Sequence, residues 1–193
     1  MKDIDIRIEL KNTLLSQFKY DENARVVEEL GLCQGAAKID VAVINGSLLG
    51  YEIKSEQDTL LRLPNQMHIY NKVFDYINIV VNEKHYAAIK EVIPEFWGII
   101  CVRKIENDFK LEERKPAQKN MGVDAISMLQ LLWKEETLLL LEKEGLLKGM
   151  KSKPRKDMWE KIANSLPKEK VNEYVRQFIK SRSKWREFDS QSQ

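Results

Sequence analysis

The residues best suited to chemistry lie between Ile39 and Lys54. Asp40 stands in a short apolar strand, Asn45-Gly46 predicts a turn, and the next strand ends in Glu52-Ile53-Lys54. Two carboxylates and a lysine at the edge of a small sheet are suited to hold a hard divalent cation and a water molecule beside a phosphodiester. This pattern makes metal-dependent cleavage of phosphodiesters the first hypothesis.

Each of these residues has an expected role. Asp40 and Glu52 are the expected ligands of Mg²⁺ or Mn²⁺, and the main-chain carbonyl of Ile53 is the expected third protein ligand in the coordination shell of the metal. Lys54 would orient the metal-bound water, favour hydroxide or stabilise negative charge on phosphorus. The simpler interpretation is a salt bridge from Lys54 to Glu52 or Asp40, which is the commoner arrangement when Asp and Glu-x-Lys occur in isolation.

Whether these side chains meet depends on the turn, because side chains alternate between the two faces along a strand. A two-residue Asn45-Gly46 turn would place Asp40 opposite Tyr51, on the other face from Glu52. A three-residue connection with Gly46 in the left-handed conformation shifts the register by one and returns Asp40 to the face of Glu52. We therefore predict the longer turn.

The chain that must position this hairpin divides into two regions near residue 118. Before that point helix-like and strand-like segments alternate, and after it every apolar pattern has the helical period. This predicts an α/β protein with a small mixed central sheet flanked by helices in residues 1–118, followed by an all-helical, basic region in residues 119–193. Helices are expected at 3–19, 22–30, 84–92, 124–145, 156–164 and 168–183, and strands at 39–44, 48–53, 76–81, 97–102 and 109–113.

Asp40, the eleven residues after it and Glu52-Ile53-Lys54, with helical segments on both sides, resemble the catalytic core of the PD-(D/E)XK nuclease superfamily over residues 22–102. The resemblance implies a restriction-endonuclease-like core and metal-dependent hydrolysis of phosphodiester bonds. Ile39 stands where the name of the family has Pro, a position that carries no chemistry.

The same resemblance implies three further site residues. Helices in the first half of the family's fold often contribute a carboxylate to the metal site, and Glu29, with Glu28 as the alternate, matches that position. Gln66 and Tyr70 resemble the Gln-x-x-x-Tyr element of exonuclease-like branches. Because they are one helical turn apart, both are expected to face the same pocket.

A narrower resemblance extends over nearly the whole chain. Several segments look like a group of bacterial and phage proteins that share a helical carboxyl-terminal region, which favours a role in phage or bacterial DNA processing or defence. These segments are Gly50–Ser55, Asp58-Thr59-Leu60, Arg62-Leu63, Leu132-Trp133 and Lys184-Trp185-Arg186.

Positive charge gathers at the carboxyl end of the chain. Residues 148–193 carry a net charge of +7 and residues 1–147 one of −5, although the whole chain has only +2. Such a segment binds phosphates by releasing counterions, so nucleic acid is the expected partner, most of all DNA, with RNA left open. A solvated helical face explains these lysines equally well. The expected nucleic-acid contacts are Arg62, Tyr70, Lys151, Lys153, Arg155 and Lys156.

Composition argues against several other classes of protein. With 193 residues, 43% of them hydrophobic, the chain can build a core, and Cys33 and Cys101 lie too far apart to suggest a disulfide framework or a zinc site. The amino terminus is charged and no run of about 18 apolar residues occurs, so we expect a cytoplasmic protein without a membrane segment. A homodimer is left open. The alternative to a nuclease is a catalytically silent protein of the same fold that binds nucleic acid or a partner protein.

Overall fold

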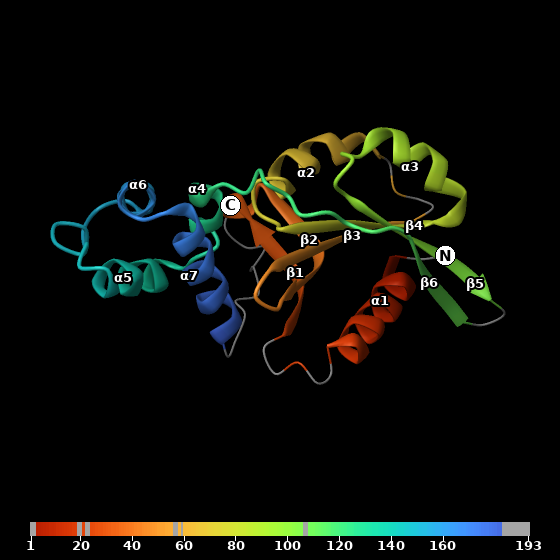
Figure 1. Cartoon of the computed structure of the whole chain (residues 1–193), viewed down its shortest axis with the longest axis horizontal. Helices are drawn as coiled ribbons and strands as arrows, with labels where there is room; N and C mark the ends of the chain where they lie inside the picture. Colours follow the sequence, from red (N-terminus) through yellow and green to blue (C-terminus); the bar gives the residue numbers. More distant parts are fainter. Residues whose placement is uncertain are drawn as a thin grey trace, which may run out of the picture.

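A single mixed sheet of six strands organises the fold (Figure 1), in the order β1-β2-β3-β4-β5-β6. The computed structural model describes residues 3–18, 21, 24–55, 58, 60–105 and 108–182. Strand β2 is antiparallel to both β1 and β3, strands β3, β4 and β5 run parallel to one another, and β6 is antiparallel to β5 at the edge. The strands are β1 (Arg25–Leu32), β2 (Ala37–Ile44), β3 (Leu48–Lys54), β4 (Tyr76–Asn82), β5 (Gly98–Ile105) and β6 (Asp108–Lys115). The expected α/β architecture is confirmed.

Helices cover both faces of this sheet. Helix α1 (Asp3–Gln17) lies on one face, while α2 (Leu63–Tyr70) and α3 (Tyr86–Val92) lie on the other (Figure 1). Helix α1 buries Ile6, Leu10 and Leu14, which are four residues apart and therefore form one stripe. Short 3-10 turns complete this part of the chain: η1 (Cys33–Gly35), η2 (Leu60–Arg62) and η3 (Glu83–His85).

The β2–β3 connection has the predicted longer turn. Ile44 pairs with Leu48, so three residues form the loop, and Gly46 has a φ of +93°. This left-handed conformation suits glycine, which has no Cβ to clash with the following carbonyl. The pairing of Val41 with Tyr51 then brings Asp40 level with Glu52. The register that the sequence required for a shared site is therefore present.

The helix predicted for residues 22–30 is wrong. Within the described part of that segment the chain forms β1, which pairs with β2 from Arg25↔Ile44 to Leu32↔Ala37. The regular alternation breaks at Glu29, whose φ is +56°. The run Glu28-Glu29-Leu30-Gly31 has good helix formers and a terminal glycine, but pairing with the neighbouring strand overrides that local preference.

The carboxyl-terminal part is helical as predicted, although the first expected helix is divided in two. The helices of the carboxyl-terminal part are α4 (Ala125–Leu129), α5 (Lys134–Lys143), α6 (Arg155–Ser165) and α7 (Lys168–Ser181). The division lies at Trp133, whose N–H donates to Glu136 Oε2 at 2.7 Å and so begins α5. The segment Lys184-Trp185-Arg186 lies outside the described residues.

The helical part and the sheet share one hydrophobic core. Met128, Trp159 and Val175 belong to the same buried cluster as Leu32 and Ile77 of the sheet. Polar contacts join the two parts as well, because Arg176 Nη1 lies 3.1 Å from Asp75 Oδ2, which also accepts from the N–H of Leu48. Within the described residues no helix is long and apolar enough to cross a bilayer.

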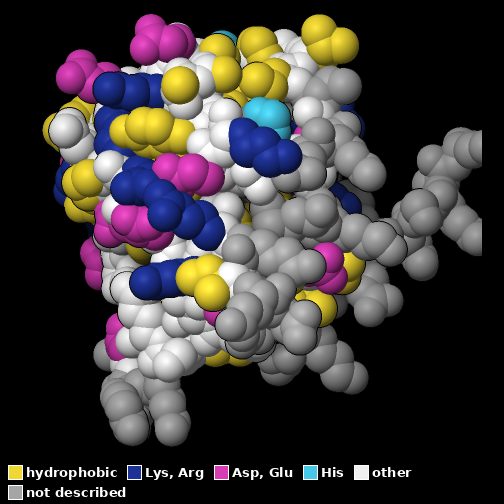
Figure 2. Space-filling view, turned by 90° about the vertical axis from the view of Figure 1, so that its right-hand side faces the viewer, with side chains coloured by type: hydrophobic (Ala, Val, Ile, Leu, Met, Phe, Trp, Pro, Cys, Tyr) yellow, Lys and Arg dark blue, Asp and Glu magenta, His cyan; other side chains and the backbone are white. Residues whose placement is uncertain are grey.

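The end of the molecule that carries α3 and the β5–β6 hairpin has a surface of mixed charge. Figure 2 shows Lys and Arg side chains interleaved with Asp and Glu on this face. Arg103 and Arg114 both pair with Glu83, at 3.2 and 2.6 Å. The opposite charges of these described residues neutralise one another at short range.

Candidate active site

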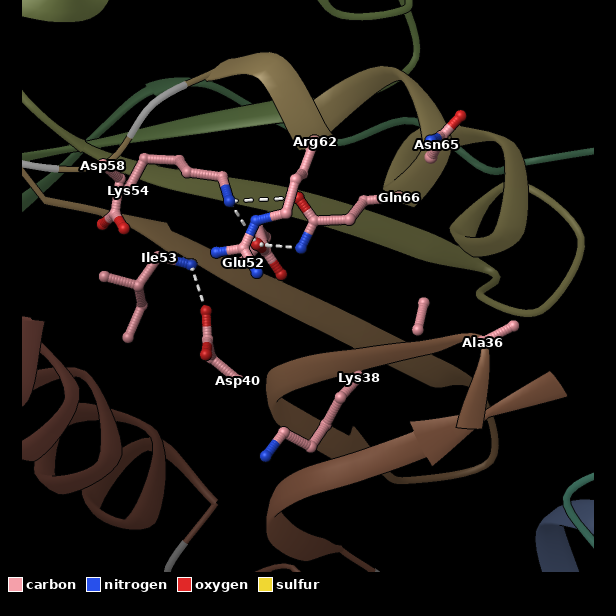
Figure 3. A pocket seen from close by; sticks show the side chains of 11 residues that line it. Ala36, Lys38, Asp40, Glu52, Ile53, Lys54, Asp58, Arg62, Asn65 and Gln66 are labelled. Carbon is pink, nitrogen blue, oxygen red and sulfur yellow. Dashed lines mark hydrogen bonds and ion pairs between the residues drawn. The ribbon is translucent and has the colours of Figure 1, made fainter. Parts of the chain in front are cut away.

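The candidate site opens where strands β2 and β3 part. Their pairing ends at Val41 and Tyr51, and beyond this pair Asp40 Oδ2 accepts a hydrogen bond from the N–H of Ile53 at 2.7 Å. The side chain thus satisfies a backbone donor that the sheet ladder no longer serves. A cavity of about 400 Å³ lies at this opening (Figure 3), and its lining includes Lys38, Asp40, Glu52, Lys54, Arg62 and Gln66.

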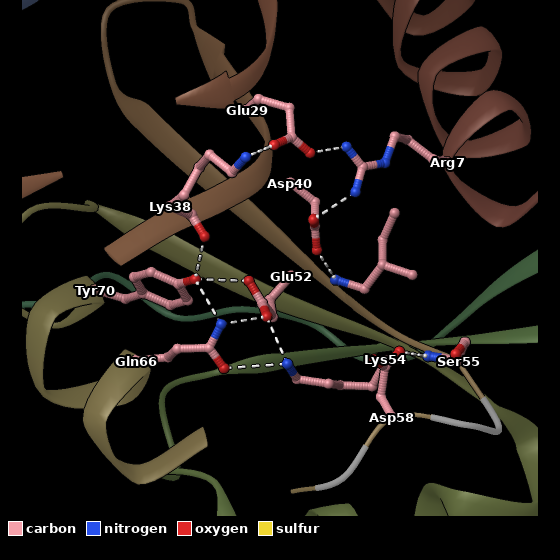
Figure 4. Close-up of polar contacts among 11 residues, drawn as sticks. Arg7, Glu29, Lys38, Asp40, Glu52, Lys54, Ser55, Asp58, Gln66 and Tyr70 are labelled. Carbon is pink, nitrogen blue, oxygen red and sulfur yellow. Dashed lines mark hydrogen bonds and ion pairs between the residues drawn. The ribbon is translucent and has the colours of Figure 1, made fainter. Parts of the chain in front are cut away.

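Glu52 is the centre of a buried polar network. Its side chain is only 3% exposed. Its Oε1 accepts from Lys54 Nζ and from Gln66 Nε2, each at 2.7 Å, and Gln66 Oε1 accepts from Lys54 Nζ at 3.0 Å. These contacts close a triangle of Glu52, Lys54 and Gln66 (Figure 4). A buried carboxylate and ammonium are stable in such a place only because each is paired and hydrogen-bonded.

Tyr70 holds the two parting strands together. Its hydroxyl lies 2.7 Å from Glu52 Oε2 of β3 and 2.7 Å from the main-chain oxygen of Lys38 in β2, and Gln66 Nε2 donates to it at 3.2 Å. Burial, followed by the charge of Glu52 and its hydrogen bond, raises the pKa of Tyr70 well above its ordinary value. The phenol therefore stays protonated and acts as a donor to Glu52. Gln66 lines the cavity, but Tyr70 is fully buried behind it and does not line it, so the expected contact of Tyr70 with nucleic acid is wrong.

Asp40 and Glu29 share a guanidinium that comes from α1. Arg7 Nη2 lies 2.7 Å from Asp40 Oδ1, and Arg7 Nη1 contacts Glu29 Oε1 (Figure 4). Lys38 contacts the second oxygen of Glu29. Burial acts to raise the pKa of Glu29, but hydrogen bonds from Lys38 and Arg7 and their charges outweigh it, and the pKa lies below its usual value.

The position of Glu29 corrects one expectation. It was predicted on a helix as a metal ligand, and it lies on strand β1 with its two oxygens engaged by Arg7 and Lys38. The alternate, Glu28, is on the same strand and pairs with Lys11. Neither carboxylate comes from a helix, because the segment that carries them is drawn into the sheet.

Asp40 and Glu52 bring carboxylate oxygens to the cavity, the type of ligand that a hard divalent cation prefers. Asp40, Glu52 and the carbonyl of Ile53 are oxygen donors on two adjacent strands, and all three residues line the cavity. Across the described part of the chain, His, Cys, Asp and Glu side chains form no group of three or more able to hold a metal. A magnesium ion held there would keep several waters, which is its ordinary preference.

The predicted nucleic-acid contacts fall into two places. Arg62, at the end of η2, is exposed and lines the candidate cavity. The basic residues of the carboxyl-terminal part lie elsewhere: Arg155 and Lys156 line a second cavity at the start of α6, and Lys151 and Lys153 are exposed in the turns before it. The structure therefore separates the catalytic candidates from most of the basic residues.

Sequence reasoning missed Arg7, Lys38 and Asp58. Arg7 is a charged residue within an amphipathic helix, and Lys38 is an exposed lysine of β2 that precedes the predicted strand 39–44, so neither has a spacing that marks it. Asp58 lines the cavity and accepts from the N–H of Ser55 at 2.7 Å, which gives it a local structural role. Arg7 contacts Asp40 and Glu29, and Lys38 contacts Glu29, across distant parts of the chain, which no local pattern encodes.

Comparison with known proteins assigns the family. The profile of the family described as Bacteriophage P4 protein cII matches residues 1–191. The chain belongs to this family. Protein cII of Enterobacteria phage P4 is 25% identical to it over 160 residues, which are 83% of this chain and 60% of that protein. This member of the cII family thus spans about 60% of the length of the curated relative.

A solved structure also aligns with this cII-family chain. It is a protein of unknown function from Silicibacter pomeroyi, with 15% sequence identity, coverage of 75% of this chain and 92% of that one, and a TM-score of 0.43. At that score the likeness carries no argument about fold or function.

Proposed function

We propose that this member of the cII family is a divalent-metal-dependent nuclease that hydrolyses phosphodiester bonds, with DNA as its substrate. One observation carries the proposal: Asp40, Glu52 and Lys54 converge at a single open cavity, in the register that a bulged three-residue turn enforces. The resemblance of this segment to the PD-(D/E)XK core supports the same chemistry. Membership of a phage protein family supports a role in phage DNA processing.

The chain's own residues have distinct tasks in this proposal. Asp40, Glu52 and the carbonyl of Ile53 would hold Mg²⁺ or Mn²⁺, and the metal would supply a water of lowered pKa and neutralise charge on the phosphate. Lys54 Nζ already makes two contacts at 2.7 and 3.0 Å, and its third proton is left for the attacking water or the phosphate. Gln66 and Tyr70 fix the orientation of the Glu52 carboxylate.

The test compares cleavage with metal binding. Purified protein should cleave DNA with Mg²⁺ or Mn²⁺, and Lys54→Ala should lose at least about 100-fold in rate, the usual effect of removing one group that stabilises transition-state charge. Mn²⁺ binding, measured by calorimetry, should persist because both carboxylates remain. Lys90→Ala removes an exposed lysine of α3 and is the matched control, with unchanged cleavage. Equal rates of cleavage by Lys54→Ala and Lys90→Ala would contradict the proposed role of Lys54.

A second candidate function is favoured by the position of Arg7. Its guanidinium occupies Asp40 Oδ1, the oxygen that a metal ligand would need to share. A protein of this fold that only binds nucleic acid or a partner protein would keep such a contact permanently. In that case calorimetry would detect no Mn²⁺ binding and no metal would support cleavage, while DNA binding would persist in EDTA.

A further inference from the structure

A second cavity lies on the other side of the turn that bounds the candidate site. Its volume is about 410 Å³, and its lining includes Gln34, Gln130, Arg155, Lys156 and Trp159. The η1 turn separates the two cavities, since Gln34 lines this one while Ala36 and Ala37 line the candidate active site. The linings of the two cavities therefore come within two residues of each other along the chain.

Arg155 is held in place before any ligand arrives. Its guanidinium lies over the ring of Trp159, 5.2 Å from the ring centroid, and its Nη2 is 3.5 Å from Gln34 Oε1. Trp159 itself is buried, with 2% of its surface exposed. A planar guanidinium fixed on an aromatic ring loses little conformational freedom when it binds a phosphate, and its fork of N–H groups matches phosphate oxygens.

Two cationic side chains, Arg155 and Lys156, line the cavity against one carboxylate, Glu160, so the cavity favours an anion with a flat apolar part. Lys156 is exposed and only loosely paired, 3.8 Å from Glu160, and Lys151 and Lys153 precede it in the exposed turns. The indole N–H of Trp159 is buried and has no hydrogen-bond partner among the described residues. Ile126 and Pro154 add apolar lining. A nucleotide combines the required negative charge, hydrogen-bond acceptors and flat base.

We propose that this cavity is a second binding site for single-stranded DNA, which holds a nucleotide next to the phosphate presented to the candidate active site. The size of the cavity suits one unpaired nucleotide, and a base inside a duplex could not turn into it. The role of this site beside the active site rests on the proposed nuclease function. The site itself is proposed only to bind DNA, without catalysing a reaction.

The test measures binding where no cleavage can occur. The Lys54→Ala protein in EDTA is titrated into a labelled single-stranded DNA oligonucleotide by fluorescence anisotropy, at several salt concentrations. A second substitution in the Lys54→Ala protein should weaken binding about tenfold for Arg155→Ala and about threefold for Lys156→Ala. Each should also reduce the dependence of the logarithm of the affinity on the logarithm of the salt concentration by about one released counterion. Arg155→Lys keeps the positive charge but loses the forked N–H groups of the guanidinium, so its affinity for the oligonucleotide should lie between those of the Arg155 protein and Arg155→Ala.

Lys161→Ala is the matched control, because Lys161 is an exposed lysine of the same helix that does not line the cavity. It should change affinity less than twofold. Equal losses in Lys161→Ala and Arg155→Ala would overturn the site and leave only diffuse electrostatic attraction. Because binding is read without metal or turnover, absence of nuclease activity would not change the outcome. If cleavage occurs, Arg155→Ala should raise KM and leave kcat nearly unchanged.

Discussion

At the scale of single residues, Arg7 is the feature that most affects how the site is understood. The register of β1 and β2 places Glu29 opposite Asp40, between the pairs Glu28↔Val41 and Leu30↔Ile39. Two carboxylates side by side repel each other, and Arg7 bridges them from α1. A divalent cation would bring the same positive charge to Asp40. Arg7 and a metal are therefore alternative sources of neutralisation.

This relation predicts how Arg7→Ala will behave. Without metal the variant should lose about 2 kcal/mol of unfolding free energy, because charge-assisted hydrogen bonds at a half-buried site are removed. Added Mg²⁺ should raise its melting temperature more than that of the unmodified protein, since the cation replaces the missing charge. Thermal unfolding with and without Mg²⁺ measures both effects.

Lys11→Ala is the control for this measurement. It removes the other ion pair between α1 and β1, Lys11–Glu28, at positions where both side chains are more than a third exposed. Its effect should stay below about 0.5 kcal/mol, with no added response to Mg²⁺. A Mg²⁺ response of Arg7→Ala no larger than that of Lys11→Ala would contradict metal binding at Asp40.

At the scale of elements, the β2–β3 hairpin decides whether a site exists. The φ of +93° at Gly46 is one that side chains with a Cβ rarely adopt, and a Cβ added there would meet no atom within 4 Å. Gly46→Ala should therefore cost about 1–2 kcal/mol through the backbone alone and leave the register intact. Urea unfolding should record the loss, and cleavage at a temperature where the variant is folded should be unchanged.

Deleting Gly46 makes the complementary variant. With Gly46 removed, a two-residue Asn45-Ser47 turn would still pair Ile44 with Leu48 and keep Asp40 level with Glu52, so a folded deletion variant should bind Mn²⁺ and cleave. A folded deletion variant that bound no Mn²⁺ would show that the register alone does not make the site.

The hairpin could be predicted from the sequence because its determinants are local. Alternation has a period of two, so the turn at Asn45-Gly46 left two registers open, and the longer turn was predicted because only that register brings Asp40 to the face of Glu52. Strand β1 was misjudged because Glu28-Glu29-Leu30 favours a helix in isolation, and the strand exists only through its pairing with β2. The roles of Arg7 and Lys38 depend on how α1 and β2 pack, which local sequence does not encode.

At the scale of the whole molecule, the division into residues 1–118 and 119–193 describes composition, while the hydrophobic core runs across it. This continuity limits what truncation can reveal about the basic region. Ending the chain at Lys148 would remove buried core residues, namely Met158, Trp159, Ile162, Val171, Val175 and Ile179.

The consequence is a prediction about folding. Losing even one buried side chain of this size costs about 2–5 kcal/mol, and domains are stable by only about 5–15 kcal/mol in total. A chain ending at Lys148 should therefore show no cooperative thermal transition and no near-ultraviolet circular dichroism. A chain ending at Arg182 keeps the bonds of that arginine to Glu136 and to the carbonyl of Leu131, at 2.7 Å or less, and should melt cooperatively. A cooperative transition in the shorter chain would instead establish residues 1–148 as an independent unit, because the remaining core would then suffice.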